Sequence, residues 1–137
     1  ANALHNLGDM AKEVGQLSEA IGFTRQALTI FLELGNRNGI GRASVNLAEL
    51  LLLEGRTAEA QEPLQRAVAW NPDHQLVLSL RALEAYTKGR YREARKLQEQ
   101  AKAKAGDSWR PSQQARLEAY VKSERKGRRV PLPSGSS

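Results

Sequence analysis

The chain has 137 residues, a formal net charge of +6 and no cysteine, so disulfides and thiolate metal sites are excluded. Ala, Leu, Glu and Arg are abundant and aromatic residues are scarce, which favours helix over sheet. Apolar runs such as residues 50–53 are far too short to span a bilayer, and we expect a soluble, cytoplasmic protein.

The charge is unevenly spread along the chain. Residues 1–87 hold 7 Lys/Arg and 10 Asp/Glu, whereas residues 88–129 hold 14 Lys/Arg and 5 Asp/Glu. The chain is therefore mildly acidic first and strongly basic last. Because it lacks an initiator Met and starts within a helical pattern, we expect a fragment of a longer protein, with a mature product as the alternative.

The first predicted elements are two helices separated by Gly15. Leu4, Leu7 and Ala11 recur at helical spacing before this glycine, and Ile21 and Leu28 do so after it. Glycine suits the end of a helix because it adopts a left-handed backbone at little steric cost. The glycine-rich stretch 35–41 is then expected to be an extended junction.

The same pattern returns twice along the chain. The residues of the first copy that recur forty positions later are Ala3, Asn6, Leu7, Gly15, Glu19, Ala20 and Ala27. The residues of the second copy that recur thirty-four positions later are Ala48, Gly55, Arg56, Glu59, Ala60 and Ala67. Gly55 and Gly89 are expected to end helices, and the recurring alanines to let paired helices approach closely. Self-similarity at this period indicates a repeat array.

These residues resemble the tetratricopeptide repeat, with Leu-Gly early in its first helix, Gly before the turn, and Ala early and late in its second helix. The forty-residue spacing is similar to that of kinesin light chains and bacterial signalling regulators. The resemblance implies an all-α fold, an α-solenoid of three helical hairpins (residues 1–40, 41–74 and 75–106) with a capping helix. We expect this helix within residues 107–125, capped by Ser112, and a flexible basic tail over residues 126–137.

No constellation of catalytic or metal-ligating residues is legible. His5 and His74 are far apart, and neither belongs to an HExxH motif. Phosphate-binding glycine motifs are absent as well. We therefore predict a non-catalytic protein without cofactor or metal.

The first helix of each pair should line the concave side of such an array. With Leu4, Leu7 and Ala11 in the core, a step of about 100° per residue turns a neighbouring stripe towards the groove. The predicted groove residues are Asn2, Asn6, Asp9, Arg42, Val45, Asn46, Glu49, Leu76, Leu80 and Leu83.

Asn6 and Asn46 occupy equivalent places in the first two copies. An amide both donates and accepts, so this pair is suited to holding the backbone of an extended peptide. The resemblance implies the same role, although hydrogen bonding to a neighbouring helix remains an alternative. We predict a protein–protein interaction scaffold that binds a peptide segment or a partner domain, within a larger bacterial regulatory protein.

The basic end suggests a second surface. The predicted residues are Arg92, Arg95, Lys102, Arg125, Lys126, Arg128 and Arg129. Because no nucleic-acid motif accompanies them, we interpret them mainly as a solvated face with an acidic protein as the next partner class. A nucleic-acid-associated module that uses this basic third stays open as the alternative function, and no membrane partner is expected.

Overall fold

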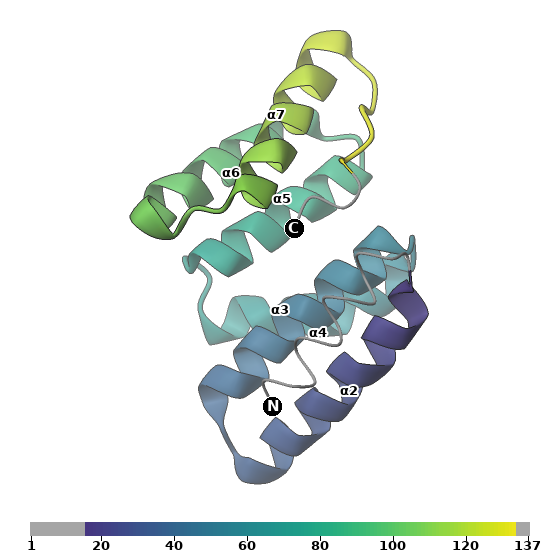
Figure 1. Cartoon of the computed structure of the whole chain (residues 1–137), viewed down its shortest axis with the longest axis vertical. Coiled ribbons are helices and arrows are strands. Elements are labelled where there is room, and N and C mark those ends of the chain that lie inside the picture. The colour runs from purple at the N-terminus through teal and green to yellow at the C-terminus, as the bar shows by residue number, and fades with distance from the viewer. Residues whose placement is uncertain (1–15, 134–137) are drawn as a thin grey trace. The chain divides into compact units, whose positions relative to one another are not determined.

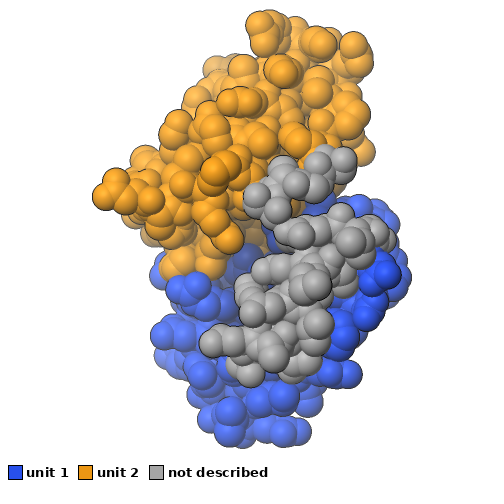
Figure 2. Space-filling model, in the orientation of Figure 1, with its two compact units in different colours: residues 1–72 blue, residues 73–137 orange. Residues whose placement is uncertain are grey.

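The computed structural model describes residues 16–133, which form six α-helices and one short 3-10 helix (Figure 1). No strand occurs within this range. The chain divides into two compact units, residues 1–72 and residues 73–137, which Figure 2 colours separately.

The first unit contains α2 (Leu17–Leu34), α3 (Arg37–Leu53) and α4 (Thr57–Trp70). Helix α3 packs against both α2 and α4. The recurring alanines Ala20, Ala48, Ala60 and Ala67 have no exposed surface. This burial confirms that the repeated small residues are packing positions, where a larger side chain would hold the helices apart.

The junction between α2 and α3 is a tight turn and not the extended segment expected from the sequence. Gly35 ends α2 with a left-handed backbone (φ 65°), and the Asn36 side chain accepts a hydrogen bond from the Gly39 amide at 3.0 Å. Asn36 is therefore the N-cap of α3. The extra residues of the forty-residue spacing lie within the helices, and α3 begins four residues before position 41.

Two glycines in the first turns of α3 pack directly against aromatic rings. A Cβ atom on Gly39 would lie 2.3 Å from Cδ1 of Phe31, and one on Gly41 would lie 2.1 Å from Cδ2 of Trp70. Phe31 belongs to α2 and Trp70 to α4. Because glycine lowers helix propensity, its presence here is explained by this close approach and not by the local backbone.

The second unit contains α5 (Gln75–Thr87), α6 (Tyr91–Ala105), the 3-10 helix η1 (Gly106–Ser108) and α7 (Pro111–Lys126). Helix α6 packs against both α5 and α7 (Figure 1). Ala82, Ala94 and Ala101 are fully buried, as the repeat pattern predicts. Gly55 and Gly89 have φ values of 81° and 79°, which confirms their predicted place at helix ends.

Helix α7 matches the terminal helix expected from the sequence, although its start differs in detail. Arg110 is its N-cap, no side chain caps it, and Pro111 is the first helical residue. The expected cap by Ser112 is therefore wrong, since proline at the first position already fixes the backbone for helix entry. Helix α7 is held to α6 by Gln98, whose fully buried amide nitrogen donates to the backbone oxygen and to Oε1 of Gln113 at 3.0 and 2.9 Å.

The segment after α7 returns to the second unit. The Tyr86 hydroxyl donates to the Val130 carbonyl at 2.6 Å, and the Val130 amide donates to Oγ of Ser123 at 2.9 Å. The Arg129 guanidinium lies 5.3 Å from the centre of the Tyr86 ring, within the range of a cation–π interaction. Residues 129–130 thus have defined partners on α5 and α7, at the start of the segment expected to be flexible.

Candidate interaction surfaces

The polar part of the predicted groove lies on α3 and belongs to the first unit. Arg42 is exposed, while Asn46 and Glu49 are half-buried. The three residues are separated by four and three positions, so they share one stripe of the helix. Val45, between them in the sequence, is only 6% exposed and contributes to the core.

The apolar part of the predicted groove lies on α5. Leu80 and Leu83 are 3% and 0% exposed, and Leu76 is half-buried. A leucine without exposed surface offers a ligand nothing to contact, so the two buried residues are core residues of this structure. Asn2, Asn6 and Asp9 lie outside the residues that the structure describes.

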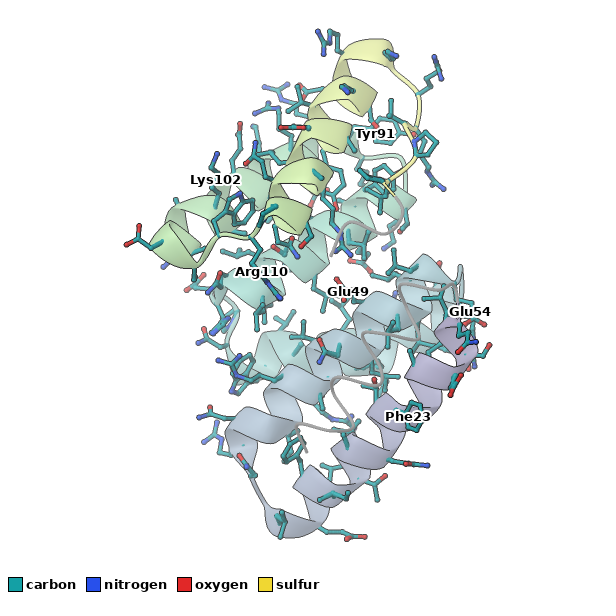
Figure 3. All side chains as sticks on the ribbon, viewed as in Figure 1. Phe23, Glu49, Glu54, Tyr91, Lys102 and Arg110 are labelled. Atoms are coloured by element: carbon teal, nitrogen blue, oxygen red, sulfur yellow. The ribbon has the colours of Figure 1, made fainter. Side chains whose placement is uncertain are left out.

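The predicted basic residues do not form one continuous surface. Arg92 is in the first turn of α6, and Lys102 lies about 15 Å further along the same helix, at a rise of about 1.5 Å per residue. Figure 3 shows the corresponding ends of α6, where Tyr91 and Lys102 are labelled. Arg125, Lys126 and Arg128 are exposed at the end of α7, whereas Arg129 contacts Tyr86 and donates to the Thr87 carbonyl.

Arg95 links α6 to α7, and its guanidinium is already paired with carboxylates of the same unit. Its guanidinium forms ion pairs with the carboxylates of Glu124 on α7 and Glu99 on α6. The hydrogen bond from Arg95 lowers the pKa of Glu124 below its ordinary value, and the positive charges of Arg92 and Lys96 add to this effect. The Glu124 carboxylate is therefore held in its ionised form.

A shallow depression of about 680 Å³ lies between the first half of α6 and the end of α7. Its lining combines a tyrosine ring, an almost buried leucine, three cations and two carboxylates: Tyr91, Leu97, Arg90, Arg92, Lys96, Glu93 and Glu124. Within the described residues this hollow belongs entirely to the second unit. It brings Arg92 together with residues that the sequence analysis did not place in a site.

A family model described as tetratricopeptide repeat matches residues 1–70, just over half of the chain. The chain belongs to the tetratricopeptide repeat family. No curated protein and no solved structure matches it. The family match and the helices together confirm the predicted all-α fold of tetratricopeptide-like helical hairpins.

Membership in the tetratricopeptide repeat family indicates a broad class of function. Such repeats generally mediate protein–protein interaction and typically act as non-catalytic scaffolds. Residues 16–133 contain no group of His, Asp and Glu side chains that could hold a metal ion. In the same part of the chain, no helix is long and apolar enough to cross a membrane.

Sequence reasoning missed the partners of the basic residues in this tetratricopeptide repeat chain. The pairing of Arg95 with Glu124 depends on two helices that are antiparallel neighbours, and the 29-residue separation carries no local signal. The place of Tyr91 in the depression was likewise hidden, although a tyrosine directly after Gly89-Arg90 was visible beside the basic cluster.

Proposed function

We propose that this chain binds a polypeptide partner through the α3 stripe formed by Arg42, Asn46 and Glu49. The family supports protein binding in general, and this stripe is the polar part of the expected groove within the described residues. On the resemblance to bacterial signalling regulators, we further place the module in a cytoplasmic regulatory protein.

The chemistry of the stripe is suited to a peptide backbone. Asn46 supplies both a donor and an acceptor, and the flanking Arg42 and Glu49 supply opposite charges one helical turn away on either side. A ligand held in this way gains affinity from hydrogen bonds to its main chain. Its specificity comes from charged side chains that are complementary to Arg42 and Glu49. The observation that carries the proposal is the exposure of Arg42 beside Asn46 on a helix whose neighbouring faces are buried.

A selection from a random peptide display library tests the proposal with the whole chain as bait. Binding of a selected synthetic peptide is then measured by calorimetry for the parent chain and for Arg42→Ala/Asn46→Ala. We expect the double substitution to weaken binding by about tenfold or more, since each lost contact of this type is worth roughly 1 kcal/mol.

The matched control is Gln65→Ala, which alters an exposed residue of α4. It should leave both affinity and melting temperature unchanged. Unchanged peptide affinity in the α3 variant, or a lower melting temperature with binding intact, would assign the stripe to helix packing and refute the proposal.

A further inference from the structure

Exposed cations gather at one end of the second unit. Those for which the structure records neither an ion pair nor a hydrogen bond are Arg92, Lys96, Arg125, Lys126 and Arg128. The ion pair of Arg95 with Glu124 sets α6 beside the last turn of α7, so these residues belong to the same end of the helix pair. Their positive charge is therefore concentrated in space as well as in sequence.

The carboxylates at this end already have cationic neighbours within the second unit. Glu124 pairs with Arg95, and Glu93 lies 3.9 Å from Arg90. Arg92 and Lys96 also act on Glu124, but the lining still holds three cations, Arg90, Arg92 and Lys96, against these two carboxylates, of which Glu124 already pairs with Arg95. The net charge of this surface is thus positive, although two carboxylates are present.

The depression also presents apolar surface between these cations. Tyr91 is half-buried and Leu97 is 8% exposed, and both belong to its lining. The Tyr91 ring packs against the Tyr86 ring in a tilted arrangement, with ring centres 6.2 Å apart. A ligand side chain that enters the depression would contact an aromatic ring whose position is already restricted by packing. The protein would therefore lose little side-chain conformational entropy on binding.

We propose that this end of the second unit binds an acidic segment of a partner polypeptide that carries an apolar or aromatic side chain. The apolar side chain occupies the depression beside Tyr91 and Leu97. Flanking carboxylates of the segment pair with Arg92 and Lys96 in the lining, and further acidic residues extend towards the exposed cations Arg125 and Arg128 at the end of α7. The site is separate from the α3 stripe and does not depend on it.

The lining favours a polypeptide over a nucleic acid. Single-stranded nucleic acids bind to rows of aromatic side chains along a basic track, and the depression offers Tyr91 alone. The fixed negative charges of Glu93 and Glu124 would also lie under a phosphate backbone. An acidic peptide needs no row of aromatic side chains, and the uncharged residues between its carboxylates can lie over Glu93 and Glu124.

The test is fluorescence anisotropy with the full chain and a labelled synthetic peptide, in which glutamates flank one phenylalanine. Charge reversal by Arg92→Glu/Lys96→Glu should weaken binding by about tenfold or more, because like charges are then brought together. The matched control is Lys102→Glu/Lys104→Glu, which makes the same change of net charge at the other end of α6 and should alter binding less than about twofold.

The two variants also separate binding from folding. New carboxylates in the last turn of α6 oppose the helix dipole, whereas those near its first turn agree with it. Because Arg92→Glu/Lys96→Glu also places new carboxylates near Glu124, the melting temperature of each variant is measured beside its binding, and a loss of affinity counts only where the variant is folded at the assay temperature. A peptide with serine in place of phenylalanine should bind more weakly to the parent chain.

Three results would overturn the proposal. The first is no binding of the peptide at low salt, and the second is an equal loss in both charge-reversal variants, which would indicate a non-specific field. The third is tighter binding of a single-stranded oligonucleotide of equal charge that loses affinity in the test variant, which would assign the surface to nucleic acid.

Discussion

The indole ring of Trp70 lies so close to Gly41 that a methyl group at residue 41 would come within 2.1 Å of the ring. Ring carbons and a Cβ atom do not approach below about 3.5 Å without loss of energy. The contact joins the end of α4 to the start of α3 and makes the glycine a packing residue.

Gly41→Ala should destabilise the first unit. The overpacked contact is expected to cost about 1–3 kcal/mol, which exceeds the gain in helix propensity of roughly 0.5–1 kcal/mol. Denaturant unfolding followed by circular dichroism measures the difference. Gly22→Ala is the control, because Gly22 is an exposed helical glycine with nothing within 4 Å, and this substitution should stabilise. Equal effects at the two glycines would contradict the packing role of Gly41.

Gln98→Glu should destabilise the second unit by about 1–3 kcal/mol at neutral pH, since it places a carboxylate where both acceptor atoms belong to Gln113. The Oε1 atom of Gln98 is buried without a hydrogen-bond partner in the structure. Gln98→Leu removes that atom together with the donor and should cost clearly less. The two unfolding free energies decide the matter, and a leucine variant as unstable as the glutamate variant would argue against the role of the amide.

Tyr86→Phe should release the segment around Val130. The substitution removes the hydrogen bond to the Val130 carbonyl, which is worth about 0.5–1.5 kcal/mol, and leaves the aromatic ring in place. We expect faster hydrogen exchange at the Val130 amide and a lower melting temperature. Tyr91→Phe provides the comparison, because the structure records no hydrogen bond from the Tyr91 hydroxyl, and exchange at Val130 should then stay unchanged.

Acidification should weaken the attachment of α7. The hydrogen bond from Arg95 holds the pKa of Glu124 below its ordinary value of 4.5 in the folded chain. A carboxyl group with a depressed folded pKa contributes stability that is fully present above 4.5 and is lost as the pH falls through the folded pKa.

The Glu124→Gln variant should therefore be less stable than the parent at neutral pH and should lose less stability on acidification. Melting temperatures measured across the acidic range test this expectation. Glu118→Gln, an exposed change on the same helix, should retain the pH dependence of the parent. Parallel pH profiles for the parent and Glu124→Gln would show that the ion pair contributes nothing.

The repeat period made the helices and their buried alanines predictable. Alanines such as Ala60 and Ala94 recur because a small residue is needed wherever two helices approach, and Gly55 and Gly89 recur because the turn needs a left-handed backbone. These requirements are local, so they leave a trace at a fixed spacing.

The surfaces were less predictable, because they depend on contacts between helices. Leu80 and Leu83 were expected in the groove from the position of the stripe, yet they are buried in the structure. Arg95 appeared to be one of many surface cations until α7 brought Glu124 beside it. Residues far apart in sequence settle these questions, and a single chain without that neighbour information shows only the helix faces.

The two glycines that pack against aromatic rings also determine the rotation of α3 about its own axis. Gly39 and Gly41 are two positions apart, which places them about 200° apart around the helix, so Phe31 and Trp70 contact α3 from nearly opposite sides. Rotation of α3 about its own axis would bring a ring against side-chain-bearing positions. The two rings therefore fix the rotation of α3 about its axis. They thereby fix the direction of the Arg42 side chain, although neither ring would contact a ligand.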